Sequence, residues 1–142
     1  MSVMALDLGE KRIGIAVSDP KLTIAHPLSV VATHDALDKA PSFTRLLEDH
    51  EVEQFIVGLP LSLDGQEHRQ AERIRRQAAQ LGQLYGLPVE FVDERLTSVE
   101  AKRVLRQMGY SEREMRGRTD KIAAGILLQT WLDSKTQETD VD

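Results

Sequence analysis

The sequence predicts an α/β protein built on a mixed five-stranded sheet with helices on both faces. Three apolar segments near the N-terminus follow one another over short links, and this arrangement favours antiparallel pairing. Farther along the chain, apolar segments of strand length alternate with segments of helical period, which predicts right-handed parallel crossovers. A mixed sheet covered on both faces satisfies both halves of this pattern.

The first three predicted strands are short and mostly apolar. Residues 2–8 (SVMALDL) and 12–18 (RIGIAVS) are separated only by residues 9–11, a link short enough for a hairpin. A third strand is expected over 27–32. These three segments therefore account for the antiparallel half of the sheet.

A helix is expected next, over residues 35–50. Leu37, Phe43 and Leu46 fall near helical spacing, which gives the segment one apolar face. Pro41 is compatible with a helix only in its first turns, because proline has no backbone N–H to donate.

Strands and helices alternate in the second half of the chain. Thr97 and Glu100 have the spacing of a helix-starting capping box, and Gly109 is a typical helix terminator. We expect a single domain over 1–135 and an acidic, frayed tail over 136–142. The remaining elements are predicted as a strand at 54–58, a helix at 66–86, a strand at 88–92, a helix at 97–108, an arginine-rich loop at 110–118 and a last helix at 119–133.

The composition excludes several classes of site. The chain has no cysteine, so a disulfide framework, a thiolate zinc site and a cysteine nucleophile are ruled out. No signal-peptide core is visible, and no apolar run approaches the ~20 residues of a membrane span. We therefore expect a cytoplasmic protein with no membrane partner.

The charge is unevenly distributed along the chain. The net charge of −5 taken alone argues against tight binding of nucleic acid. However, six basic and two acidic residues give segment 102–118 a net charge of +4, whereas segment 133–142 carries −3. Much of the acidity therefore lies in the tail, and a basic segment is left available for a polyanionic partner.

Three acidic positions are distinguished by where they fall in the predicted elements. Asp7 interrupts an apolar strand expected at the centre of the sheet, where a carboxylate is costly unless it is paired or binds a metal. Asp93 and Glu94 follow the strand that ends at Val92, and strand alternation points their side chains to opposite faces. Spacing alone does not decide which of the two joins a shared site.

The third acidic position is Asp120, which starts the helical stripe that packs on the sheet. Ala123, Ala124 and Gly125 follow it, and such small residues allow a close approach of helix and sheet. Simpler interpretations exist for all three positions, since Asp7 could be a solvated strand-end residue and Asp120 a helix cap. Acids are also common in loops that lead into helices.

A set of carboxylates would suit a divalent metal site. Mg²⁺ and Mn²⁺ prefer carboxylate oxygens, and two such ions about 4 Å apart can activate water and stabilise the leaving oxygen of a phosphodiester. The four histidines are scattered and show no zinc-binding pattern. The sequence therefore favours Mg²⁺ or Mn²⁺ over zinc.

Four segments closely resemble the YqgF/RuvX family. They are LDLGEKRIGIAVSD at 6–19, GLPLSLDG at 58–65, DERLTSVEA at 93–101 and TDKIAAGILLQTWL at 119–132. That family is similar to the RuvC-type Holliday junction resolvases and is linked to maturation of the pre-16S rRNA end. The resemblance spans nearly the whole chain and preserves the order of the motifs.

The resemblance implies an RNase H-like fold with strand order 3-2-1-4-5, and an acidic triad. The triad falls on Asp7, Glu94 and Asp120, which would be both the catalytic residues and the metal ligands. RuvC-type enzymes carry a further acid one turn after the last one, where this chain has Ala123 and Ala124. A four-carboxylate site is therefore in doubt, unless Asp93 supplies the missing ligand.

Basic residues near these acids are candidates for substrate phosphate binding. Such contacts position a strand without reading its sequence. Each of these residues could equally be an ordinary solvated surface residue. The candidates are Lys11, Arg12, Arg95, Arg116 and Arg118.

The function expected from the resemblance is metal-dependent hydrolysis of a phosphodiester, leaving 3′-hydroxyl and 5′-phosphate ends. Precursor rRNA is the favoured substrate and branched DNA the alternative, with the protein acting as a monomer or a homodimer. A nucleotide-dependent phosphotransferase is a second hypothesis, because such folds also open with an Asp-x-Gly strand. A ribosome-assembly binding module without catalysis is the third.

Overall fold

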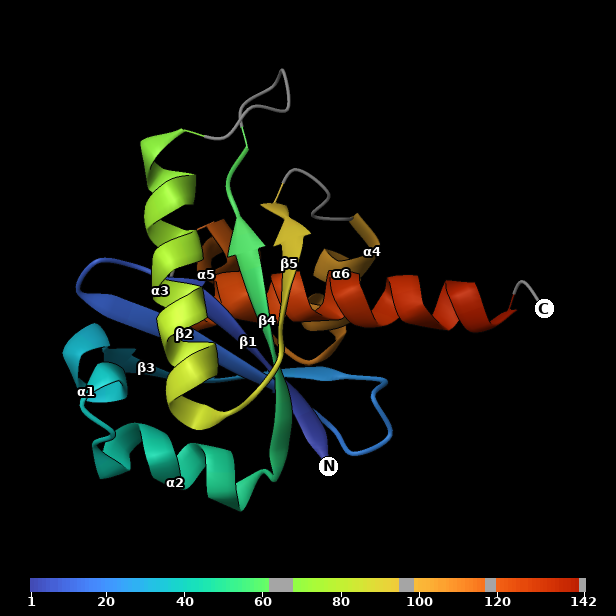
Figure 1. Cartoon of the computed structure of the whole chain (residues 1–142). Helices are drawn as coiled ribbons and strands as arrows, with labels where there is room; N and C mark the ends of the chain where they lie inside the picture. Colours follow the sequence, from blue (N-terminus) through green and yellow to red (C-terminus); the bar gives the residue numbers. More distant parts are fainter. Residues whose placement is uncertain (62–67, 95–98, 117–119, 141–142) are drawn as a thin grey trace.

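The computed structural model describes residues 1–61, 68–94, 99–116 and 120–140, and for 115, 116, 120 and 136–140 it describes the backbone only. Its five strands form one sheet (Figure 1). The strands are β1 (Ser2–Leu8), β2 (Arg12–Ser18), β3 (Ala25–Ala32), β4 (Val52–Leu59) and β5 (Val89–Asp93). The helices are α1 (Thr33–Leu37), α2 (Pro41–Asp49), α3 (Arg69–Tyr85), α4 (Val99–Gln107), α5 (Glu112–Arg116) and α6 (Asp120–Asp140).

The sheet is mixed, as the sequence predicts. Its order is β3-β2-β1-β4-β5, which confirms the expected 3-2-1-4-5 arrangement. The pairs β1–β2 and β2–β3 are antiparallel, whereas β4 pairs in parallel with both β1 and β5. The central strand β1 is therefore flanked by a hairpin partner on one side and a crossover partner on the other.

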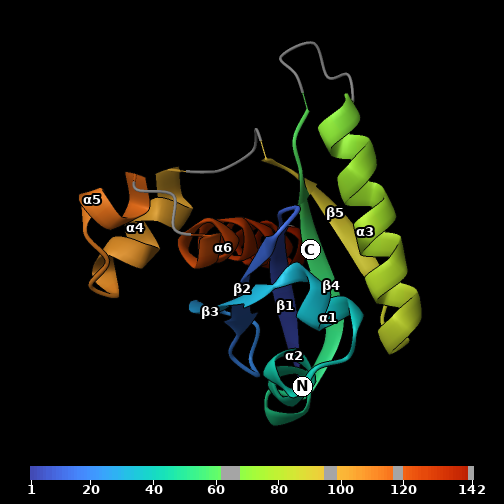
Figure 2. The same ribbon diagram turned by 90° about the vertical axis from the view of Figure 1, so that its left-hand side faces the viewer.

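Strand alternation divides the sheet into two apolar faces. Even-numbered β1 residues such as Leu6 pack in the larger core with α1, α2 and α3, while odd-numbered ones such as Ala5 pack under α6. Figure 2 shows α3 on one side of the sheet and α6 on the other, with α4 and α5 beyond α6. The predicted helices on both faces are thus confirmed.

Helix α6 lies unusually close to the sheet. A Cβ atom added at Gly125 would be 2.8 Å from Pro27 Cγ and 3.3 Å from Leu105 Cδ2. Ala124 is fully buried against the sheet, so the predicted use of small residues for close packing is confirmed. On its outer side α6 packs against α4 through the cluster of Ala101, Leu105, Ile122 and Ile126.

The helix expected over 35–50 is wrong as a single element. The chain forms two helices, and Pro41 is the first residue of the second one. Proline disfavours helical backbone in the residue before it, and Lys39 adopts a left-handed φ of 57° between the two helices. The break thus falls where the proline forces it.

The polar loop expected over 110–118 is also wrong in part, because residues 112–116 form α5. Ser111 and Glu114 make a capping box in which Ser111 N donates to Glu114 Oε1 and Glu114 N donates to Ser111 Oγ. The Thr97 of the other predicted capping box lies outside the described residues. The α4 helix ends near Gly109, whose φ is 104°, as expected.

Several element boundaries differ from the sequence prediction. Strands β3 and β4 are longer than expected, and α6 continues to Asp140, past the predicted end at residue 133. The segment after Asp133 contains neither proline nor glycine, so nothing in it stops a helix. Within the described residues, no helix is long and apolar enough to cross a membrane.

Candidate active site

Asp7 is half-buried near the end of the central strand β1. It follows Val3 and Ala5 at alternate positions, and both of these residues pack in the cluster under α6. Asp7 therefore belongs to the α6 face of the sheet. Its partner on the neighbouring strand β2 is Gly14, which adds no side chain beside the carboxylate.

Glu94 directly follows β5 and points to this same face. Val92, two residues earlier, packs against the α6 cluster. A Cβ atom added at Gly58 would lie 2.8 Å from Glu94 Oε1 and 3.1 Å from Leu127 Cδ2, so the Glu94 side chain lies beside Gly58 and α6. Asp93, the alternative left open by the sequence, alternates to the other face as the β5 partner of Leu59.

The environment of Glu94 disfavours its negative charge. Burial of the carboxyl raises the pKa of Glu94 above its ordinary value of 4.5, and the charges of Asp7 and Asp93 raise it further. Although much of the residue is exposed, its carboxyl end lies against the sheet. Glu94 and Asp7 are thus close enough to repel each other, and a bound cation would relieve this repulsion.

Gly58 provides the space that the Glu94 side chain occupies. It lies on β4 between β1 and β5, one position after Val57, which pairs with Leu6. The sequence predicts a strand that ends at Gly58, and β4 continues one residue farther, to Leu59. Glycine inside a strand often marks a close approach, and this was the sequence signal for its role.

Asp120 is the first residue of α6, and its side chain lies outside the description. Its position on the helix is one turn before Ala124, which is buried on the sheet. Among the described side chains, which exclude that of Asp120, no group of three His, Asp or Glu residues could hold a metal. The structure therefore brings Asp7 and Glu94 together, and metal binding by Asp7, Glu94 and Asp120 stays a prediction.

The structure describes only some of the predicted phosphate-binding residues. Lys11 and Arg12 are exposed on the β1–β2 hairpin, just past Asp7. Arg116 ends α5, but its side chain is not described. Arg95 and Arg118 lie outside the described residues.

The residues present fit a divalent cation. The donors are carboxylate oxygens, the ligand type that Mg²⁺ and Mn²⁺ prefer. The space beside them would be filled by a single added carbon at Gly58. Burial and the charges of Asp7 and Asp93 raise the pKa of Glu94, and a nearby cation would oppose this effect.

The chain is similar to known proteins over nearly its whole length. The family model "RuvX: Holliday junction resolvase" matches residues 1–134. A protein of Anaeromyxobacter sp. (strain Fw109-5) is 44% identical over 135 residues, which are 95% of this chain and 98% of the relative. One of Dictyoglomus thermophilum is 39% identical over 139 residues, 98% of this chain and 100% of the relative. Both bear the name "Putative pre-16S rRNA nuclease".

Solved structures of RuvC share the fold. Thermus thermophilus RuvC matches with a TM-score of 0.61 at 14% identity, covering 96% of this chain and 97% of RuvC. Its complex with a Holliday junction substrate matches with a TM-score of 0.62 at 12% identity, covering 96% of each chain. Together with the strand order, this likeness confirms the predicted RNase H-like fold.

Proposed function

We propose that this chain, which belongs to the RuvX family, is a metal-dependent nuclease that acts in maturation of the 5′ end of pre-16S rRNA. The observation that carries the proposal is the pairing of Asp7 and Glu94 on one face of the sheet, where burial and mutual repulsion raise the pKa of Glu94. A divalent cation bound between two such acids would offset their mutual repulsion. The names of the relatives supply the substrate.

Asp7, Glu94 and Asp120 would hold the metal, with Mg²⁺ or Mn²⁺ as the expected ion. When bound, a pair of such ions supplies activation of water and neutralisation of charge at the leaving oxygen. The rigid strand β1 fixes the Asp7 carboxylate, and Gly58 lets the Glu94 carboxylate approach it. Placement on the sheet limits how far the two acids can drift apart, which matters because misplacement by about 1 Å can cost about 100-fold in rate.

Basic residues near these acids in the sequence would bind substrate phosphates. Lys11 and Arg12 follow Asp7 on the hairpin, and Arg95, Arg116 and Arg118 are the further candidates. Such contacts position the strand and carry no sequence information. Cytoplasmic location, and action as a monomer or homodimer, remain predictions from the sequence.

Incubation of the purified protein with precursor rRNA tests the proposal. With Mg²⁺ or Mn²⁺, we expect cleavage near the mature 5′ end, with 5′-phosphate and 3′-hydroxyl products. Asp7→Asn keeps the size of the side chain but removes the negative charge, so cleavage is expected to fall by about 100-fold or more. Mapping of the product ends gives the position of the cut.

Asp49→Asn is the matched control. Asp49 is an exposed residue at the end of α2, so the same change there is expected to leave cleavage unaltered. A branched DNA junction is assayed in parallel, because cleavage of that substrate alone would replace the RNA assignment. Absence of metal-dependent cleavage of both the precursor rRNA and the DNA junction would refute the nuclease proposal and favour a binding module.

A further inference from the structure

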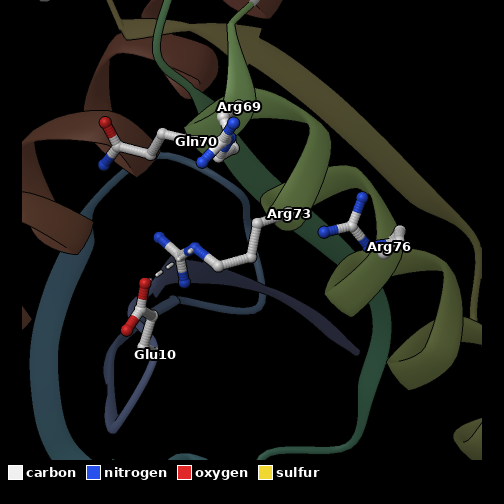
Figure 3. A pocket seen from close by; sticks show the side chains of 5 residues that line it. All are labelled: Glu10, Arg69, Gln70, Arg73 and Arg76. Atoms are coloured by element: carbon white, nitrogen blue, oxygen red, sulfur yellow. Dashed lines mark ion pairs between the residues drawn. The ribbon is translucent and has the colours of Figure 1, made fainter.

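A pocket of about 490 Å³ lies between α3 and the β1–β2 hairpin. Figure 3 shows the side chains that line it, and three of the five are arginines from one face of α3. The lining residues are Glu10, Arg69, Gln70, Arg73 and Arg76. None of them belongs to the predicted acidic site or to the basic residues assigned from the sequence.

Arg73 is held in place inside this pocket. Its Nη1 donates to Gln77 Oε1 at 2.9 Å, and Gln77 Nε2 in turn donates to Gly9 O at 3.1 Å. The Arg73 side chain is 21% exposed, and its Nε lies 3.9 Å from Glu10 Oε1 (Figure 3). The guanidinium is thus oriented by the helix and the hairpin together, and less entropy is lost when it binds a ligand.

The charge of the pocket differs in sign from that of the whole protein. The side chains that line the pocket include three guanidinium groups and one carboxylate, although the chain has a net charge of −5. Glu10 is 78% exposed and its ion pair with Arg73 is long, so it compensates only a small part of the positive charge. Guanidinium groups bind phosphate oxygens in pairs of parallel hydrogen bonds, so phosphate fits this set of donors.

The pocket is close to the candidate active site along the hairpin. Glu10 follows Asp7 by three residues, so their Cα atoms are at most about 10 Å apart even in a fully extended chain. Nucleic acid carries a phosphate for roughly every 3.4 Å of rise along one strand. Helix α3 and helix α6 cover opposite faces of the sheet, so a strand that joins the two sites has to pass around the end of β1 and span a few nucleotides.

We propose that this pocket, lined by Arg69, Arg73 and Arg76, binds backbone phosphates of the nucleic acid strand a few nucleotides from the bond that is cut. The inference rests on the proposed function for the identity of the ligand. Because contacts to backbone phosphates carry no base information, this binding is expected to be independent of sequence. The Glu10 carboxylate competes with phosphate for Arg73 and keeps this affinity moderate.

Fluorescence anisotropy with a labelled RNA hairpin that carries a single-stranded 5′ extension tests the proposal, in buffer with EDTA so that the RNA stays intact. The double variant Arg69→Gln with Arg76→Gln is expected to bind roughly tenfold more weakly at fixed salt. The slope of log affinity against log salt is expected to fall by about 1 for each arginine removed. Both arginines are exposed, so the fold is expected to persist.

Arg45→Gln with Lys21→Gln is the matched control. Both residues are exposed and outside the pocket, and their removal changes the net charge by the same amount. Equal loss of affinity in the control and in the pocket variant would overturn the proposal, because it would reduce the effect to overall charge.

Glu10→Gln separates phosphate binding from a structural role of the Arg73–Glu10 pair. If phosphate competes with Glu10, the variant binds RNA about twofold more tightly. Unchanged affinity together with lower stability would mean that the pair only ties the hairpin to α3, and would overturn the proposal.

A cleavage assay on the same variants keeps this inference apart from the proposed function. Cleavage lost in Asp7→Asn, with RNA affinity unaffected in the pocket variant, refutes the pocket alone. Affinity that depends on the arginines in a protein that cuts neither RNA nor DNA refutes the nuclease and retains the pocket.

Discussion

Gly58 leaves room for the Glu94 side chain beside β4. An added Cβ would meet Glu94 Oε1 at 2.8 Å and Glu94 Cγ at 3.1 Å. The carboxylate is the far end of a flexible side chain, so it can move away at modest cost. The consequence of a larger residue at this position is therefore a displaced acid in an otherwise intact protein.

Gly58→Ala is expected to lower cleavage by about 10- to 100-fold, because Glu94 no longer lies where the acidic pair requires it. The free energy of unfolding is expected to change by less than about 2 kcal/mol. Cleavage rates and urea unfolding curves measure the two effects separately.

The control is Gly82→Ala, whose Cβ would be equally crowded, at 2.9 Å from Val89 Cγ2 and 3.0 Å from Leu87 O, but away from the acids. It is expected to affect stability and to leave cleavage unchanged. Equal loss of cleavage in both variants would contradict the role given to Gly58.

The hydrogen bonds to the Asp19 carboxylate predict that the stability of the protein depends on pH. Burial raises its pKa, but this is outweighed by hydrogen bonds from the Thr23 hydroxyl and from Ile24 N and Thr23 N, so the pKa lies below its ordinary value of 3.8. The folded protein therefore favours the ionised form. The stabilisation is complete above pH 3.8 and is lost as the pH falls through the lower, folded-state pKa.

Asp19→Ala removes these bonds and is expected to cost about 1 kcal/mol at pH 7. Comparison of urea unfolding of both proteins from pH 7 down to acid pH checks the effect, because the difference should shrink only at the acid end. A difference that stays constant over that range would show that the carboxylate charge is not involved.

At the level of elements, local sequence signals explain where helices begin and break. Pro41 divides the region 33–49 into α1 and α2, and Ser111 with Glu114 starts α5 in a segment whose polar composition suggested a loop. The spacing of Ser111 and Glu114 is that of a capping box, a local signal for this helix that the prediction of a loop did not use. Polarity does not exclude a short helix that lies on the outside of the protein.

The contact of α6 with β3 gives a prediction at this scale. Gly125→Val would drive a side chain into Pro27, 2.8 Å from the Cβ position, and is expected to cost about 1–3 kcal/mol through overpacking. Urea unfolding measures the loss as a lower midpoint with an unchanged slope.

Ala123→Val is the control, since it introduces the same β-branched residue on α6 at a partly exposed position. It is expected to show only the smaller cost of helix propensity. Equal destabilisation by the two variants would mean that overpacking against Pro27 is not the cause of the loss of stability in Gly125→Val.

At the level of the whole molecule, metal binding should couple the acidic site to folding. If Mn²⁺ binds the folded protein alone, a concentration of about 100 times its Kd adds about 2.7 kcal/mol. For a chain of this length that raises the Tm by roughly 10 °C. Thermal unfolding with and without Mn²⁺ measures the shift.

Asp7→Asn is expected to abolish most of the Mn²⁺ effect, whereas Asp49→Asn is expected to keep it. Without metal, Asp7→Asn should be at least as stable as the unmodified protein, because it removes a charge that repels Glu94. An equal Mn²⁺ shift in both variants would place the bound metal somewhere other than at Asp7.

The sequence by itself determined the elements of the sheet and the motifs that imply its strand order, because alternation and helical period depend on short stretches of chain. The sequence also indicated Asp7 as a candidate site residue, because a carboxylate in an apolar central strand is costly unless it is paired or binds a metal. Spacing did not choose between Asp93 and Glu94; the family resemblance favoured Glu94, and the tertiary structure shows that Glu94 lies on the face of Asp7. Strand β5 is an edge strand with every residue half-buried, so its pattern does not reveal which face α6 covers. The space at Gly58 and the arginine pocket likewise depend on distant segments meeting, which no local pattern encodes.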